Sequence, residues 1–267
     1  PNPAVLVPVT YDADMQSDFS DLRFTDASGT TTVPFWVERF TAGVSADVWV
    51  QVPELPADDT ATLFMYYGNS SASSTSSSTA TFSAVDDFED GDIAEYDGIP
   101  ADLAIYEAST DEVYGGSYSL APSSGNEGDR ATNGIVRFDQ TVSQGQTIRY
   151  RQYVDVSAGP DDESCVIFGA TSSVSDNENY GVCYELFNDD RLSLVQDVES
   201  TDTAGGVSVL ASTSVDFTTT YGTGWYETYI DWQTNGTIGV RLYDPTGALI
   251  ATTSASSTTY TTGGYGF

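Results

Sequence analysis

Histidine and lysine are both missing from this sequence, and its only basic residues are eight arginines. These absences exclude Ser-His-Asp catalysis and lysine Schiff-base chemistry. Against the eight arginines stand 40 acidic residues, so the formal net charge is −32. Because phosphate binding needs basic patches, this balance disfavours nucleic acid and anionic membrane surfaces as partners.

Basic charge is so scarce that the chain would repel itself at ordinary ionic strength. At 1 M salt the Debye length falls to about 3 Å, which screens surface repulsion almost to contact. The composition therefore predicts a protein from an extreme halophile. Carboxylates are then the background of the whole sequence, and a local acidic cluster says little by itself.

Long apolar runs are absent as well, since no stretch approaches the roughly 20 residues that a membrane helix needs. The sequence begins without a start methionine or signal peptide and ends at Phe267 in what reads as a strand. We therefore expect a piece of a longer exported protein, with no membrane insertion in this fragment.

Cysteine is limited to Cys165 and Cys183, which bracket a pattern of strand, polar turn and strand. Folding this segment back on itself predicts a disulfide, worth about 3 kcal/mol and typical of an extracellular protein. The alternative is two buried free thiols. A zinc site is disfavoured without histidine. The glycosylation sequons at Asn69 and Asn235 also fit surface export.

Helical periodicity is missing, and apolar residues alternate in short runs between Gly, Pro, Asp and Ser, which is the strand-and-turn pattern. In one run Val48 and Val50 share a face while Trp49 and Gln51 share the other, which predicts a strand covered on one side and partly on the other. Turns are expected at Asn235-Gly236, of type I′, and at residues 244–247, of type I.

We predict an all-β protein made of two antiparallel β-sandwich domains, the second a jelly roll. The first is a small domain over residues 1–69, incomplete at its N-terminus. Residues 70–83 are rich in Ser and Thr and are expected to form a linker or an exposed loop, because little apolar surface is available there to offset ordering. The second domain covers residues 84–267 and is incomplete at its C-terminus.

Several motifs carry family resemblances. The stretch WYETYIDWQTNGTIGVRLYDPTGALIATTSAS, with DDFEDGD at residues 86–92, resembles the concanavalin A-like lectin/glucanase sandwiches of secreted proteins. The motifs YDADMQSDFSDLRFTD, VPFWVE, VWVQVPELPA and FMYYGN are similar to a domain of unknown function that often precedes such a sandwich in haloarchaeal and other prokaryotic surface proteins. The first resemblance covers residues 84–267. The second covers roughly residues 4–69, lacks that family's usual first strand, and has no activity to transfer.

Such a sandwich is suited to sugar binding, because sugars are held by aromatic platforms and planar polar groups. Alternation in TIRYRQYVDV puts Arg149, Arg151 and Tyr153 on one face, where the arginines could contact carboxylated or sulfated sugars. The alternative is that they pair with Asp and Glu across the sheet. Tyr180 and Tyr184, beside a polar loop, form a second candidate cluster.

A bound calcium ion is the one cofactor that the sequence suggests. In DDFEDGD we expect Phe88 to be the inward anchor of a first strand, and the surrounding acids could supply several of the six to eight oxygens that calcium needs. The alternative is a plain turn at a domain boundary, since the spacing is not that of an EF-hand. The candidate ligands are Asp86, Asp87, Glu89, Asp90 and Asp92.

Catalysis is not expected. The sandwich glucanases resemble one another in a Glu-x-Asp-x-x-Glu strand, whose carboxylates act at about 5–5.5 Å. Glu107 and Glu112 have that spacing, but Ser109 replaces the aspartate. Glu227 and Asp231 share a strand face, which we interpret as a solvated sandwich face. The resemblance further implies that the neighbouring Trp225 and Trp232 face the core.

Two classes of function remain open. The first is an extracellular adhesion or glycan-binding protein on the surface of an extreme halophile, or a viral fibre or spike that recognises such a surface. Its partners would be surface glycans or glycoproteins. The second is a non-catalytic structural subunit of an extracellular filament or virion, whose partners would be further copies or neighbouring subunits. A glycoside hydrolase is disfavoured because its motif is absent.

Overall fold

The computed structural model describes residues 3–54, 60–98, 103–123, 134–157, 163–171, 178–186, 190–197 and 208–267. Within these residues the regular structure consists of 18 β-strands, one short α-helix and one π-helical turn. Every strand pairing among them is antiparallel. The protein is therefore all-β, as the alternating sequence pattern predicts.

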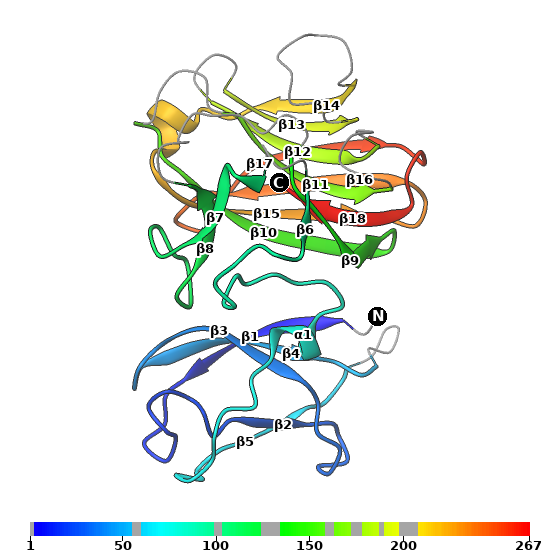
Figure 1. Cartoon of the computed structure of the whole chain (residues 1–267). Coiled ribbons are helices and arrows are strands. Elements are labelled where there is room, and N and C mark those ends of the chain that lie inside the picture. Colours follow the sequence, from blue (N-terminus) through cyan, green and yellow to red (C-terminus); the bar gives the residue numbers. More distant parts are fainter. Residues whose placement is uncertain are drawn as a thin grey trace. The chain divides into compact units, whose positions relative to one another are not determined.

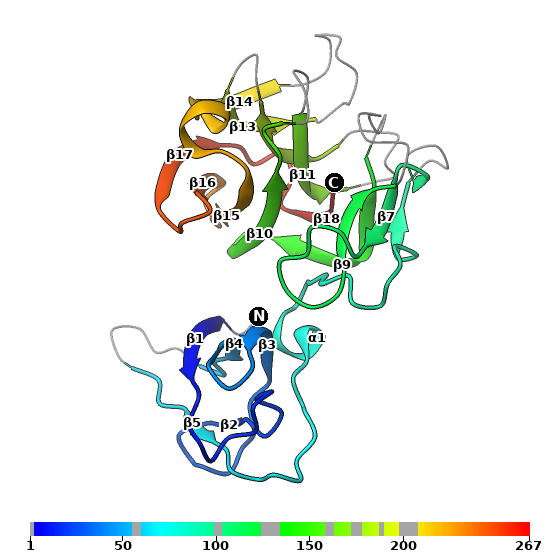
Figure 2. The ribbon, with the colours of Figure 1, turned by 90° about the vertical axis from the view of Figure 1, so that its left-hand side faces the viewer.

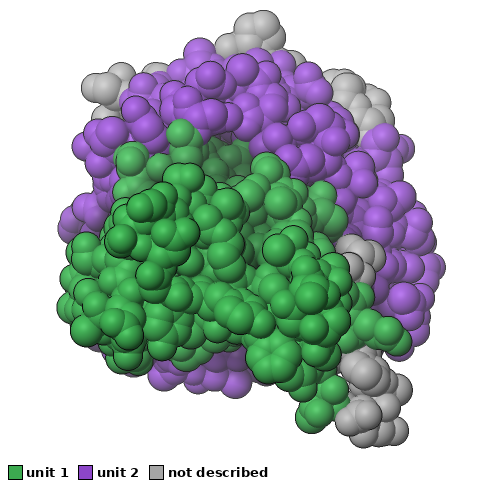
Figure 3. Space-filling view, turned by 90° about the horizontal axis from the view of Figure 1, so that it is seen from below, with its two compact units in different colours: residues 1–89, 115–117 green, residues 90–114, 118–267 purple. Residues whose placement is uncertain are grey.

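The chain divides into two compact units, coloured separately in Figure 3. Unit 1 comprises residues 1–89 and 115–117, and unit 2 comprises residues 90–114 and 118–267. The division falls inside the acidic segment 86–92, slightly later than the boundary near residue 84 that the sequence suggests.

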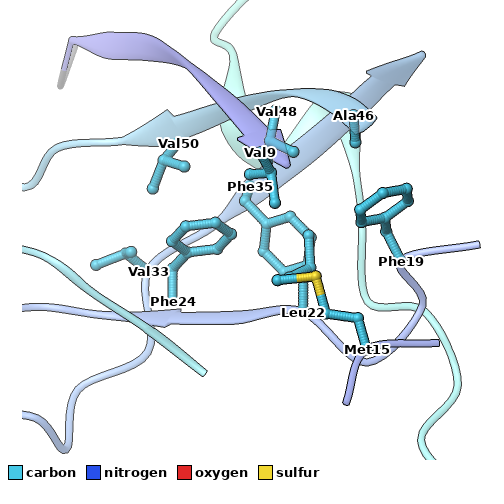
Figure 4. Packing of buried hydrophobic residues seen from close by; sticks show 10 residues of the cluster. All are labelled: Val9, Met15, Phe19, Leu22, Phe24, Val33, Phe35, Ala46, Val48 and Val50. Atoms are coloured by element: carbon cyan, nitrogen blue, oxygen red, sulfur yellow. The ribbon is translucent and has the colours of Figure 1, made fainter. Parts of the chain in front are cut away.

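Unit 1 contains a three-stranded sheet of order β1-β4-β3 and a two-stranded sheet of β2 and β5. These form two layers (Figure 2), and side chains from both point into the space between them (Figure 4). The elements are β1 (Ala4–Thr10), β2 (Arg23–Thr25), β3 (Phe35–Thr41), β4 (Ser45–Gln51), β5 (Phe64–Tyr66) and α1 (Ser78–Thr81). The buried cluster consists of Val9, Met15, Phe19, Leu22, Phe24, Val33, Phe35, Ala46, Val48 and Val50.

Strand β4 is covered on one face and partly on the other, as its pattern predicts. Val48 and Val50 are fully buried in the cluster between the sheets. Trp49, on the opposite face, lies directly across from Trp36 of β3. The ring of Phe82 packs on both tryptophans, with ring centroids 5.9 Å from Trp36 and 5.6 Å from Trp49.

The segment 70–83 differs from the expected linker, because it belongs to unit 1. Its Ser77 amide donates to the Phe35 carbonyl at 2.9 Å, and the Ser76 hydroxyl accepts from the Val37 amide at 2.8 Å. The Ser77 side chain also caps helix α1. Backbone and hydroxyl hydrogen bonds, rather than apolar burial alone, hold this segment against the sheet. We call residues 76–82 the strap.

Unit 2 is built from two sheets and a hairpin (Figure 1). One sheet has the order β10-β15-β16-β17, the other has the order β14-β13-β12-β11-β18-β9-β6, and β7 pairs with β8. The elements are β6 (Tyr96–Asp97), β7 (Tyr106–Ser109), β8 (Ser119–Pro122), β9 (Val136–Ser143), β10 (Gln146–Val154), β11 (Glu163–Ala170), β12 (Tyr180–Glu185), β13 (Arg191–Gln196), β14 (Ser208–Ser214), the π-helix η1 (Phe217–Tyr221), β15 (Gly224–Trp232), β16 (Thr237–Tyr243), β17 (Leu249–Ser256) and β18 (Thr262–Gly266).

Side chains of the two large sheets pack face to face. Trp232 of β15 meets Phe168 of β11 at 5.3 Å and Tyr180 of β12 at 5.9 Å between ring centroids. All three side chains are buried. An antiparallel sandwich is therefore confirmed for unit 2, while the jelly-roll connectivity stays a prediction.

The two predicted turns join the strands of the four-stranded sheet. At residues 244–247 the Gly247 amide donates to the Asp244 carbonyl at 2.9 Å, and Gly247 has a φ of 83°. This fits a type I turn followed by a left-handed glycine. The expected type I′ turn at Asn235-Gly236 is wrong, because the Gly236 amide closes onto Gln233 and only Gly236 has positive φ, so Asn235 is not left-handed.

Candidate functional site

The predicted disulfide between Cys165 and Cys183 is present. The two residues lie directly opposite each other on β11 and β12, which form an antiparallel hairpin pair. Among the described residues, no helix is long and apolar enough to cross a membrane.

The outward face of the four-stranded sheet collects charged and aromatic side chains. Along β15, Tyr226, Thr228, Ile230 and Trp232 are buried, so the residues between them point outward. The register places outward residues of β10, β16 and β17 beside them. We call this surface the outer face, and it consists of Thr147, Arg149, Arg151, Tyr153, Trp225, Glu227, Tyr229, Asp231, Gly239, Arg241, Tyr243, Thr252 and Ser254.

The alternation predicted for Arg149, Arg151 and Tyr153 is confirmed, and so is the pairing of the arginines across the sheet. Arg149 Nε forms an ion pair with Glu227 Oε1, and Arg151 Nη2 lies 3.1 Å from the same oxygen. The three side chains are only 14–23% exposed. An acidic sugar would have to displace or neighbour Glu227 to reach these guanidinium groups.

One end of the outer face is aromatic. The ring of Trp225 lies 5.6 Å from that of Tyr114 and 5.5 Å from that of Tyr153, and the Arg151 guanidinium lies 3.8 Å above the Tyr114 ring. Desolvation raises the pKa of the Tyr153 hydroxyl, and the carboxylates of Glu112 and Asp155 raise it further, so this hydroxyl stays a hydrogen-bond donor.

The expectation that both tryptophans of β15 face the core is wrong for Trp225. Trp232 is 1% exposed and packs between the sheets, whereas Trp225 lies on the outer face. The two residues are seven positions apart, and an odd separation along a strand places side chains on opposite faces.

The other end of the outer face is polar and hollowed. The Arg241 guanidinium donates two hydrogen bonds to Asp231, from Nε at 3.1 Å and from Nη2 at 3.2 Å, and Thr147 Oγ1 donates to Asp231 at 2.8 Å. Gly239 of β16 lies directly opposite Asp231, and an added Cβ at Gly239 would meet nothing within 4 Å. The resulting hollow is lined by Asp231, Gly239, Val240, Arg241, Thr252, Thr253 and Ser254.

Sequence reasoning missed this hollow and its Arg241. One signal was available, because an isolated glycine inside a strand often marks a close approach of a ligand or another backbone. Gly239 stands in the run TIGVRLY, between two inward apolar residues.

The second candidate cluster does not form a ligand site. Tyr180 and Tyr184 are both no more than 1% exposed. The Tyr180 hydroxyl donates to Ser257 Oγ at 2.8 Å, and the Tyr184 hydroxyl shares a 2.5 Å hydrogen bond with Thr228. Burial raises the pKa of Tyr184 well above its ordinary value. Strand β12 lies inside its sheet and is buried on both faces, so neither choice of alternation leaves these tyrosines exposed.

The acidic segment 86–92 is irregular and not the expected first strand of the sandwich. Phe88, expected as its inward anchor, is only partly buried and has a φ of 58°. Asp86, Asp87 and Glu89 belong to unit 1, where Asp86 accepts from the Phe88 amide and Glu89 from the Ser117 amide at 2.8 and 2.7 Å.

A different acidic group is close enough to share one cation. The ligand atoms of Asp90, Asp92 and Glu95 all lie within 4.8 Å of one another. Glu95 also pairs with Arg137 at 3.0 Å. Two of the five predicted calcium ligands therefore come together with a third residue that the sequence did not suggest, and calcium binding stays a prediction.

The asparagines of both sequons are exposed. Asn69 Oδ1 accepts from the Ser71 amide at 3.0 Å, and Asn235 Oδ1 accepts from the Thr237 amide at 2.9 Å. Both asparagines thus lie in surface turns, where sequons are expected.

Comparison with known proteins bears on the N-terminal region. No curated protein and no solved structure matches the chain. A protein-family model does match residues 18–97, which confirms the N-terminal resemblance to a domain of unknown function. The concanavalin A-like assignment of unit 2 stays a prediction. Over residues 18–97 the chain is similar to the family described as "Domain of unknown function (DUF2341)".

Proposed function

We propose that this protein is an extracellular, non-catalytic glycan-binding protein that serves adhesion, and that it binds sugars through the outer face of unit 2. One observation carries the proposal: aromatic rings, guanidinium groups and carboxylates gather on a single sheet face that also contains a hollow. Aromatic surfaces with a few fixed polar groups are the general chemistry of small-ligand sites.

The charge of this face supports a recognition role. Three of the eight arginines lie on it, at positions 149, 151 and 241, with the carboxylates of Glu227 and Asp231 between them. A region that gathers three of the chain's eight arginines and nearly balances their charge stands apart from a chain of net charge −32. The arginines hold both carboxylates in ion pairs, which favours binding over acid–base catalysis by these groups.

The setting that we propose is the surface of an extreme halophile, or a viral fibre or spike that recognises it. The acidic composition supports high salt. The disulfide supports an oxidising, extracellular compartment.

A structural subunit of a filament or virion is the second candidate, and an observation in unit 1 favours it. The side chains of Phe64, Met65, Tyr66 and Tyr67 are 37–47% exposed, and among the described residues β5 pairs only with β2. An edge strand with exposed apolar side chains is suited to pairing with another chain.

A glycan array in molar salt, with and without a calcium chelator, tests the proposal. We expect selective binding by the wild type and loss of binding in Trp225→Ala. The matched control is Trp36→Ala in unit 1, which should bind as the wild type does. Absence of binding to any glycan would reject the proposal and favour the structural-subunit function.

A further inference from the structure

We propose that the hollow over Gly239 is a subsite for two adjacent hydroxyl groups of a neutral sugar, a proposal that rests on the glycan-binding function above. It deepens that function by naming the ligand class. It also replaces the carboxylated or sulfated sugars expected at Arg149 and Arg151.

The shape of the hollow follows from one missing side chain. Gly239 lies opposite Asp231 of β15 and Ser254 of β17, and Arg241 lies opposite Thr252. Directly opposed residues share a sheet face, so these four side chains surround the bare backbone of Gly239. Thr252 and Ser254 are exposed, and the Arg241 side chain is 39% exposed, so a ligand can reach the hollow from solvent.

Hydrogen-bonding capacity remains on these groups. A guanidinium has five N–H donors. Arg241 directs three of them to protein, two to Asp231 and one from Nη1 to the Tyr243 hydroxyl at 3.3 Å, which leaves two for a ligand.

The rest of the wall adds acceptors and further donors. The Asp231 carboxylate accepts three hydrogen bonds, while an ionised carboxylate has about four acceptor sites. Within the described part of the chain, the hydroxyls of Thr252 and Ser254 form no hydrogen bond to protein. The hollow therefore presents donors and acceptors side by side, which is what a pair of sugar hydroxyls requires.

The charges around the hollow favour a neutral ligand. Arg241 and Asp231 form a bidentate ion pair, so their charges cancel, and a carboxylate or sulfate at the guanidinium would lie against the Asp231 carboxylate. The nearby Arg149 and Arg151 are engaged by Glu227. Hydroxyl groups can donate to Asp231 and accept from Arg241 without this repulsion.

Aromatic residues hold Arg241 in position. Its guanidinium lies 5.0 Å from the centroid of Tyr229, and the rings of Tyr229 and Tyr243 meet edge to face at 5.7 Å. Partial burial lowers the pKa of Arg241, but the contacts to Tyr243 and Asp231 raise it by more, so the guanidinium stays charged.

The decisive variant is Gly239→Val. Its new side chain meets no protein atom within 4 Å of Cβ, and valine favours strands, so we expect the fold to be kept while the hollow is filled. The probes are arrayed glycans ending in neutral hexoses and, separately, in uronic acids or sulfated sugars. We expect neutral-glycan affinity to fall about tenfold or more.

Two further variants complete the test. Ser254→Val changes the wall of the hollow and should also weaken neutral-glycan binding, so the result does not depend on the folding of Gly239→Val alone. Ser256→Val, an equally exposed position on the same strand outside the lining, is the matched control and should leave binding unchanged. Melting temperatures of all variants report whether the fold is intact.

Each outcome decides between the two proposals. Neutral-glycan binding that survives both Gly239→Val and Ser254→Val overturns the subsite. Binding of anionic glycans alone, unaffected by Gly239→Val, overturns the subsite but leaves the glycan-binding function standing. If the wild type binds no glycan, the function fails and the subsite fails with it.

Discussion

Both units place aromatic residues on a sheet face that points away from the core between their sheets, but the two faces are covered to different extents. In unit 1 the strap lies over Trp36 and Trp49 through Phe82. In unit 2 Tyr114 packs on the end of the outer face at Trp225, while Thr252 and Ser254 at the other end are exposed. A sheet face with an exposed polar hollow has the features of a binding site, whereas a face whose aromatic rings pack against a segment of the same unit has a structural role.

The largest effect is expected where the two faces of one strand are compared. Trp232→Ala should lower the free energy of unfolding by about 4 kcal/mol, because it removes a fully buried ring from the sandwich. Trp225→Ala should cost only about 1 kcal/mol, since that ring is partly exposed. Urea unfolding in molar salt measures both, and equal losses would contradict the assignment of inner and outer faces.

The disulfide should stabilise unit 2 and not unit 1. Replacing Cys165 and Cys183 together by alanine should lower the unfolding free energy of unit 2 by about 3 kcal/mol. Hydrogen exchange measured segment by segment reports the stability of each unit separately. Protection lost to the same extent in the strands of unit 1 would show that the units do not unfold independently.

The strap offers a matched pair in unit 1. Phe82→Ala should destabilise unit 1 by about 2 kcal/mol and shift tryptophan emission to longer wavelength, because water then reaches Trp36 and Trp49. Phe40→Ala, at a ring that is 50% exposed, should change stability by about 0.5 kcal/mol or less. Unchanged emission in Phe82→Ala would mean that the strap does not cover this face in solution.

The smallest effect at neutral pH is expected at Tyr226 in unit 2, whose hydroxyl also makes stability depend on alkaline pH. Burial raises the pKa of Tyr226 from 10.0 to about 12, with the Asp244 carboxylate adding to the shift. A group whose folded-state pKa is raised stabilises the fold below its ordinary pKa, and this contribution is lost as the pH rises from about 10 towards 12.

Tyr226→Phe should therefore flatten the fall in unfolding free energy between about pH 10 and 12. At neutral pH the variant should lose about 1 kcal/mol, because the Tyr226 hydroxyl donates to the Gly222 carbonyl at 2.7 Å. Urea unfolding at a series of pH values measures both the loss of unfolding free energy at neutral pH and its slope between about pH 10 and 12. If the unfolding free energy of Tyr226→Phe falls with pH as steeply as that of the wild type, the raised pKa of Tyr226 is contradicted.

Local patterns predicted much of the fold. The strands, the type I turn at residues 244–247 and the Cys165–Cys183 pair all depend on residues close together in sequence. The shared face of Arg149 and Arg151 follows from alternation within one strand. The strap was missed because its stability comes from hydrogen bonds to β3, which composition does not reveal.

The candidate site was predicted less well. Tyr180 and Tyr184 sit beside a polar loop in the sequence, but their strand lies inside the larger sheet and the opposite sheet buries their rings. The family expectation for Trp225 failed because it disregarded the alternation that separates it from Trp232. Gly239 gains meaning only from Asp231 and Ser254, which come from two other strands.

By itself the sequence determined the all-β class, the antiparallel hairpins and the disulfide, because these follow from period-two alternation, turn residues and short-range chain closure. The tertiary structure decided which face of each strand is covered, how Glu227 engages two arginines, and where a missing side chain leaves a hollow. These depend on the pairing of strands far apart in the chain and on the packing of one layer against another, and no local pattern encodes them.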